Sequence, residues 1–146
     1  MNPALALDPS YGTVELKIPA KAEWVAVARL AVAAVASRLR FSVDEIDDVK
    51  LAIAEACTNC IQQGSDSDQI EITCEAMSEE LRVSVRDRGV ALHLESVDQD
   101  RDRFGGDGNR TEELGVFLIR ALMDHVEYHV DPRQGTELHM TKRVTG

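Results

Sequence analysis

Apolar residues recur at close to helical spacing in two long stretches of the chain. From about 22 to 39 this spacing aligns one face made of Trp24, Val27, Ala31, Val35 and Leu39. From about 43 to 63 it aligns a second face made of Ile46, Val49, Ile53, Cys57 and Ile61. We therefore predict two amphipathic helices, the second one beginning at Ser42 and Glu45, which form a capping-box pattern. A third helix is predicted at about 113–124.

Polar and apolar residues alternate in the other regular segments, which is the pattern of strands with one buried face. The predicted strands cover residues 13–18, 70–76, 81–87, 125–130 and 136–142. Short polar turns join the second strand to the third and the fourth to the fifth. The expected fold class is an α/β (α+β) two-layer sandwich, with helices on one face of a mixed, mainly antiparallel sheet.

Two segments fall outside this regular pattern. Residues 1–12 predict a flexible amino-terminal arm, and the Gly-, Asp- and Arg-rich stretch at 88–112 predicts a long lid loop. The chain has 146 residues and a mass of 16.1 kDa, which suits one domain at 13–146 with a core of its own.

Charge and hydropathy exclude several classes of partner. A net charge of −10 and a pI near 4.8 argue against direct nucleic-acid binding, which needs a basic surface. No apolar run approaches the roughly 20 residues that span a bilayer, and no signal peptide is recognisable, so we expect no membrane association and a cytoplasmic protein. An acidic chain would suit a partner that carries basic patches.

The three cysteines favour a reducing compartment over a disulfide framework. Cys57 and Cys60 form a C-x-x-C pair, which is compatible with redox chemistry or with a metal, but both lie within the second predicted helix. Buried, small apolar side chains are the favoured interpretation. His125 and His129 can share one strand face, yet zinc is not favoured because no third ligand accompanies them.

Glu55 and Asn59 are the most informative polar pair of the sequence. They are four residues apart in the second predicted helix, so they lie on the same face, roughly away from the apolar stripe. A carboxylate can accept a proton or orient a nucleophile, and an amide oxygen one turn later can hold a hard cation such as Mg²⁺. By themselves the two residues are a weak signal, because a polar helix face with Glu and Asn is usually just solvated.

The motifs that follow this pair point to a known superfamily. The chain contains, in order, an E-x-x-x-N helix at Glu55 and Asn59, a D-x-G at Asp87 and Gly89, Gly115 before a helical segment, and Gly135-Thr136 entering the last strand. This combination resembles the GHKL ATPase superfamily. The stretches VELKIPAKAEWVAVARLAVAAVASRLRFSVDEIDDVKLAIAEACTN, VSVRDRG, LGVFLIRALMDHVEY and GTELHMTK are similar to anti-sigma factor serine kinases of the sigma B type.

The resemblance covers roughly residues 14–142 and implies the Bergerat ATP-binding fold. It implies that Glu55 is the general base and that Asn59 binds the Mg²⁺ that bridges the phosphates of ATP or ADP. It also implies that Asp87 accepts a hydrogen bond from the adenine amino group, with Thr136 supporting that carboxylate. Gly89 would let the backbone approach the base, or would simply allow the turn.

The sequence departs in part from the family pattern around the glycine motif that precedes the third predicted helix. Gly115, near the start of the third predicted helix, would let amides face phosphate oxygens. Glu113 stands where these kinases usually carry the first glycine of a Gly-x-Gly motif, with Gly106-Asp107-Gly108 as a rival pair. The 88–112 loop also contains Arg101, Arg103 and Arg110, and the resemblance implies that one of them, with Arg110 as the named candidate, contacts the γ-phosphate.

The resemblance also implies that the protein regulates transcription as part of a stress response. The expected protein is a homodimeric anti-sigma factor that sequesters an alternative sigma factor and phosphorylates a STAS-domain anti-anti-sigma protein on serine. The dimer interface is expected on residues 14–20 and the Trp24 helix. The alternative is a binding switch that keeps the fold and the partner surface but has weak or lost kinase activity.

Overall fold

The computed structural model of the chain describes residues 11–62, 69–87, 107–131 and 135–145; the side chains of 107–114, 130, 131 and 135 lie outside this description. The elements follow in the order β1 (Gly12–Pro19), α2 (Ala22–Ala36), α3 (Val43–Gln62), β2 (Gln69–Ala76), β3 (Glu80–Asp87), α5 (Asp107–Leu122), β4 (His125–Asp131) and β5 (Gly135–Arg143). Within these ranges no helix has the length and apolar character needed to span a membrane.

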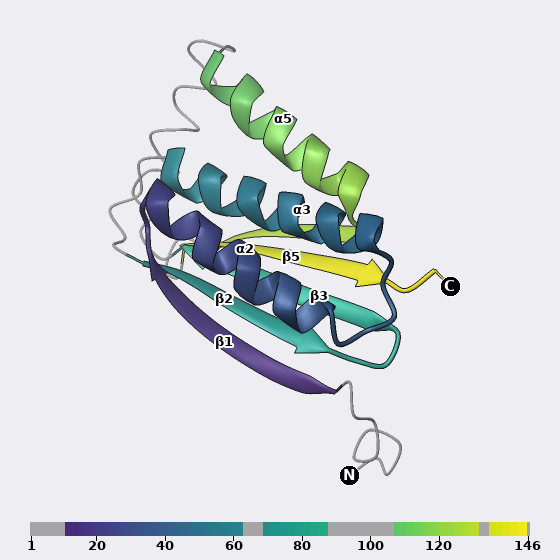
Figure 1. Cartoon of the computed structure of the whole chain (residues 1–146). Coiled ribbons are helices and arrows are strands. Elements are labelled where there is room, and N and C mark those ends of the chain that lie inside the picture. Colours follow the sequence, from purple (N-terminus) through teal and green to yellow (C-terminus); the bar gives the residue numbers. More distant parts are fainter. Residues whose placement is uncertain (1–10, 63–68, 88–106, 132–134, 146) are drawn as a thin grey trace.

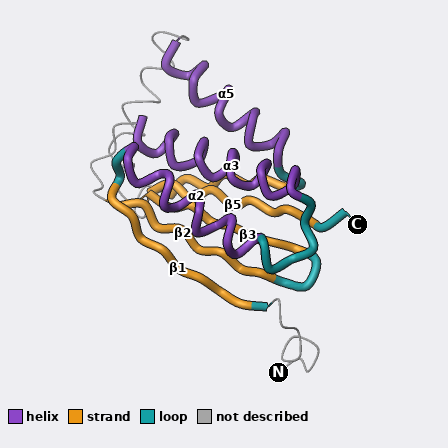
Figure 2. The backbone as a smooth tube through the Cα atoms, viewed as in Figure 1, coloured by secondary structure: helices purple, strands orange, loops and turns teal. Residues whose placement is uncertain are grey.

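The strands form one five-stranded sheet in the order β1-β2-β3-β5-β4, and the helices cover one of its faces (Figures 1 and 2). Each neighbouring pair of described strands is antiparallel. The predicted two-layer α+β class is therefore confirmed. The inner sheet face and the helices share a core of buried apolar side chains that includes Ile70, Ile72, Val83, Val85, Leu138 and Met140.

Helix α3 begins and packs as its sequence predicts. The Ser42 backbone N–H donates to Oε1 of Glu45 at 2.9 Å, and the Glu45 backbone N–H donates to Oγ of Ser42 at 3.1 Å, which completes the capping box. The hydrogen bond from Ser42 is the main reason that the pKa of Glu45 lies below its ordinary value. Val49, Ile53 and Cys57 are fully buried, so the predicted apolar stripe of this helix is confirmed.

Helix α2 buries only part of the face that its spacing predicts: Val35 and, just after the helix, Leu39 are buried as expected. Its buried residues are Ala28, Val32, Val35 and Ala36. Trp24 and Val27, expected on the same face as Val35, are 41% and 42% exposed. The helix is apolar almost all round, so helical periodicity by itself cannot select the side that packs on α3 and the sheet. One apolar side of α2 is therefore left on the surface.

Helix α5 is longer at its amino end than predicted. It begins at Asp107, so residues 107–112, expected in the lid loop, are helical, whereas residues 88–106 lie outside the described part. An aspartate in the first turn favours a helix start because it faces the positive end of the helix dipole. Ile119 and Met123 are buried in the core and hold the helix in place along α3. Most helical stability in proteins comes from such packing, which composition alone does not reveal.

Candidate functional site

Glu55 and Asn59 lie on consecutive turns of α3, away from its fully buried stripe. Both side chains are half-buried. Within the described part of the chain, the Glu55 carboxylate has no hydrogen-bond or ion-pair partner, and the same is true of the Asn59 amide. The carboxylate is therefore free to accept a proton, and the amide oxygen is free to act as a ligand.

Asp87 is a completely buried carboxylate at the end of β3, on the side of the sheet that faces the helices. Its negative charge contributes to raising the pKa of the Cys60 thiol, so Asp87 lies close to the last turns of α3. The carboxy-terminal end of α3, the end of β3 and the start of β5 are at the same end of the molecule (Figure 1). A fully buried carboxylate where these elements meet is a candidate for ligand recognition.

Thr136 is the direct partner of Asp87 in the antiparallel register of β3 and β5. Its hydroxyl Oγ1 is buried and finds no hydrogen-bond partner among the described residues. Buried hydroxyls are nearly always hydrogen-bonded in proteins, directly or through water, so this group indicates a site that a ligand or water completes. The sequence predicted Asp87 and Thr136 together, and strand pairing places them side by side.

Gly115 does not lie near the start of a helix, so that prediction is wrong. It lies well inside α5, which begins at Asp107, and its role toward the phosphates stays a prediction. It touches α3: a Cβ built on Gly115 would be 2.6 Å from Nδ2 and 2.7 Å from Oδ1 of Asn59. Sequence reasoning missed this contact, although a glycine within a run of good helix formers is a signal of close packing.

Two predicted residues lie outside what the structure describes. Gly89 follows the end of β3 and is not among the described residues, and the side chain of Arg110, within α5, is not described either. Their roles, and that of Glu113 in the second turn of α5, stay predictions.

The three cysteines are unsuited to nucleophilic or redox chemistry. Burial raises the pKa of the Cys57 thiol to about 12 and that of the Cys74 thiol to about 11. Burial, with a smaller contribution from neighbouring negative charges, also raises the pKa of Cys60. The thiolate is the reactive form, and thiols with such pKa values stay protonated near neutral pH. The interpretation of Cys57 as a buried apolar side chain is confirmed.

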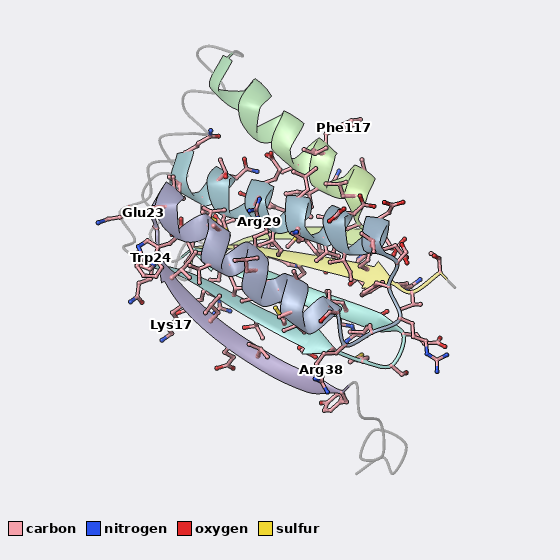
Figure 3. The ribbon with its side chains drawn as sticks, viewed as in Figure 1. Lys17, Glu23, Trp24, Arg29, Arg38 and Phe117 are labelled. Atoms are coloured by element: carbon pink, nitrogen blue, oxygen red, sulfur yellow. The ribbon has the colours of Figure 1, made fainter. Side chains whose placement is uncertain are left out.

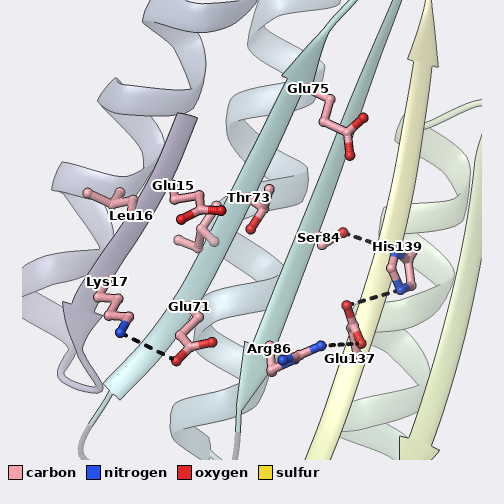
Figure 4. Close-up of a pocket in the computed structure, with 11 residues that line it drawn as sticks. Glu15, Leu16, Lys17, Glu71, Thr73, Glu75, Ser84, Arg86, Glu137 and His139 are labelled. Atoms are coloured by element: carbon pink, nitrogen blue, oxygen red, sulfur yellow. Dashed lines mark hydrogen bonds and ion pairs between the residues drawn. The ribbon is translucent and has the colours of Figure 1, made fainter. Parts of the chain in front are cut away.

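The outer face of the sheet carries a separate, polar surface on the opposite side from the helices. A pocket of about 500 Å³ lies over β1, β2, β3 and β5 (Figure 4). The register aligns Lys17, Glu71, Arg86 and Glu137 in one row of alternating charge, with ion pairs of 4.0 Å and 3.0 Å at its two ends. Cross-strand pairs of opposite charge account for this row, so it is best explained as the solvated face of the sheet.

Histidines gather at one edge of the same outer face. His125 and His129 share a strand face, as predicted, and both contact the carboxylate of Glu127, at 2.9 and 3.2 Å. His139, which is isolated in the sequence, packs edge-on against His129 and lies 3.0 Å from Oγ of Ser84. No group of three His, Cys, Asp or Glu side chains that could hold a metal ion is found among the described residues, here or elsewhere.

The helix-side site has the chemistry that a magnesium nucleotide requires. Asn59 offers an amide oxygen to a hard cation, Asp87 offers a buried acceptor to a purine amino group, and Thr136 offers an unused buried hydroxyl. Glu55 offers a carboxylate for proton transfer one helical turn before Asn59. The donor and acceptor set therefore fits ATP with Mg²⁺.

Comparison with known proteins supports the same assignment. Residues 18–142 match the family described as "Histidine kinase-like ATPase domain". The chain is 38% identical over 142 residues to the "Serine-protein kinase RsbW" of Bacillus cereus (strain ATCC 10987 / NRS 248), covering 92% of this chain and 86% of that protein. The kinases of the same name from Bacillus mycoides (strain KBAB4) and Bacillus anthracis (strain CDC 684 / NRRL 3495) are 37% and 38% identical, with the same coverage.

Proposed function

This chain belongs to the histidine kinase-like ATPase domain family, and from that premise we propose that it is an ATP-dependent protein serine kinase. The observation that carries the proposal is the convergence of separate elements at one end of the molecule. There the carboxy-terminal half of α3, with Glu55 and Asn59, adjoins the buried Asp87 of β3 and its strand partner Thr136.

Nucleotide recognition in this proposal is divided between two elements. Asp87 accepts a hydrogen bond from the adenine amino group, and the Thr136 hydroxyl supports that carboxylate from the neighbouring strand. Guanine presents an oxygen where adenine presents the amino group, so a carboxylate at this place favours ATP over GTP. Asn59 holds Mg²⁺, which when bound neutralises charge on the phosphates.

Catalysis in this proposal depends on Glu55. Its carboxylate takes the proton of a serine hydroxyl on the protein substrate. The serine oxygen then forms a bond to the γ-phosphorus, while the bond between that phosphorus and the β,γ-bridging oxygen breaks and ADP leaves. The half-buried and unpaired state of Glu55 supports this role, since no cation competes for the carboxylate within the described residues.

The partners of the proposal are a sigma factor and a STAS-domain anti-anti-sigma protein. The chain would sequester the sigma factor in one state, and in the other it would bind the STAS protein and phosphorylate it on serine. Whether ATP or ADP is bound would bias which of the two partners the chain prefers. The net charge of −10 supports a protein partner with basic patches rather than nucleic acid.

The proposal is tested by incubating the purified chain with γ-labelled ATP and a purified STAS-domain protein. We expect label on a serine of the partner, in a reaction that requires Mg²⁺. Sigma-factor binding without transfer of label would support the non-catalytic switch instead. If the chain neither binds the sigma factor nor transfers label, the proposed function is overturned.

We also propose that the chain is a homodimer built on the exposed side of α2 and on β1. Trp24 is 41% exposed and Leu30 61% exposed, and Val14 is exposed on the adjacent strand. Figure 3 shows Trp24 on the surface of α2. Large exposed apolar patches mark interaction sites, and a symmetric patch that meets itself is the commonest arrangement.

Light scattering is expected to report a mass twice the 16.1 kDa of one chain. The measurement is made at roughly tens of micromolar, a concentration chosen from ordinary affinity ranges. Leu30→Asp should yield a monomer, because it places a charge in the apolar contact. Phe117→Asp is the matched control, since Phe117 is 72% exposed but lies on α5. A monomeric wild-type chain, or a Leu30→Asp variant that stays dimeric, would contradict this interface.

A further inference from the structure

Gly115 is in close contact with the side chain to which the magnesium role is assigned. A Cβ at this position would lie 2.6 Å from Nδ2, 2.7 Å from Oδ1 and 3.1 Å from Cγ of Asn59. Distances below 3 Å are overlaps, so the amide group of Asn59 occupies the space that any other residue at 115 would fill. At this point the backbone of α5 therefore packs against the amide of Asn59 on α3. Figure 1 shows the two helices side by side.

The glycine is not required by the conformation of the backbone. Gly115 lies within the regular helix α5, and its φ is not in the positive range that favours glycine. Glycine is among the least favourable residues inside a helix. What an added Cβ would meet here is the end of the Asn59 side chain, so a larger residue at 115 would displace this amide.

The Asn59 amide is also not held by hydrogen bonds within the described part of the chain. Its direction is consequently set by packing, and Gly115 supplies one wall. This part of α5 is anchored in the core, because Ile119, one turn after Gly115, and Met123, directly after the helix, are both buried.

We propose that Gly115 is a positioning residue for Asn59: its missing side chain leaves the space in which the α3 amide is held ready for the metal. This inference rests on the proposed role of Asn59 in the kinase. It assigns Gly115 a steric task on α3.

The test is a double-mutant cycle on binding, made with Gly115→Ala, Asn59→Ala and the variant that carries both. Calorimetry measures the affinity for ADP with Mg²⁺ and again with EDTA, so that no turnover is involved. We expect Gly115→Ala to weaken Mg-ADP binding by about 10- to 100-fold, the range usual for residues that orient a metal ligand. Binding in EDTA should change little. The double variant should bind Mg-ADP no more weakly than Asn59→Ala does. Once the Asn59 amide has been removed, a methyl group at position 115 has no amide to displace.

Melting temperatures give a readout that does not depend on the nucleotide. In the Asn59→Ala background, Gly115→Ala should raise the melting temperature by about 2–8 °C, since the better helix former then meets no obstacle. In the presence of Asn59 the gain should be smaller. Gly12→Ala is the matched control, because a Cβ at Gly12 meets nothing within 4 Å, and it should leave Mg-ADP affinity unchanged.

The outcomes separate the inference from the function on which it rests. Unchanged Mg-ADP affinity in Asn59→Ala would overturn the metal role of Asn59, and the inference with it. Weakened binding in Asn59→Ala but not in Gly115→Ala would overturn the inference alone. Additive losses in the double variant would also overturn it, because they would mean that Gly115 acts on the nucleotide independently of Asn59.

Discussion

Glu55→Gln is expected to lower the rate of phosphate transfer to the protein substrate by about 10²- to 10⁴-fold, the usual contribution of a general base. Glutamine has almost the shape of glutamate but cannot take the serine proton. Because Glu55 is half-buried and makes no ion pair among the described residues, its neutralisation should not disturb the fold. Affinity for Mg-ATP should therefore stay close to that of the wild-type chain. Single-turnover transfer of labelled phosphate, with calorimetry for binding, measures both quantities.

Glu75→Gln provides the matched control for this substitution. Glu75 is also half-buried, but it lies on the outer face of the sheet, away from α3. The same chemical change there should leave transfer and binding at wild-type values. Wild-type rates in Glu55→Gln would remove Glu55 from the role of base, and a parallel loss in Glu75→Gln would show that the effect is not local.

Asp87→Asn is expected to weaken ATP binding by about 10- to 150-fold. This is the loss of one hydrogen bond to a charged acceptor, about 1.5–3 kcal/mol. The effect should be large because Asp87 is 0% exposed, so water cannot replace the carboxylate. The preference for ATP over GTP should also fall, since the asparagine amide can donate to the oxygen of guanine. Calorimetric titration with ATP and GTP gives both results.

A surface aspartate tests whether this effect belongs to the buried position. Asp47 on α3 is exposed and lies 3.9 Å from Lys50, a surface ion pair of the kind that contributes little. Asp47→Asn should bind both nucleotides like the wild-type chain. Equal affinity of the wild-type chain for ATP and GTP would contradict the assignment of Asp87 to the adenine amino group.

The features that the sequence determined are those that depend on neighbours along the chain. The capping box of Ser42 and Glu45 forms as the sequence predicts, because its hydrogen bonds join residues that are only three apart in the chain. The alternating strands and the apolar stripe of α3 follow from periodicities of the backbone itself. Glu55 and Asn59 share a helix face for the same reason, so this half of the candidate site could be predicted.

Only the tertiary structure decided which surfaces meet. The sequence of α2 offers apolar residues on nearly every side, and packing on α3 and the sheet selected Ala28 and Val32 over Trp24. The start of α5 depends on a buried stripe that anchors it, which the composition of 107–112 does not show. The contact of Gly115 with Asn59 joins distant segments, and no local pattern encodes the distance between two helices. Strand register likewise placed Thr136 opposite Asp87, because a hydrogen-bonded ladder fixes every pair once one pair is fixed.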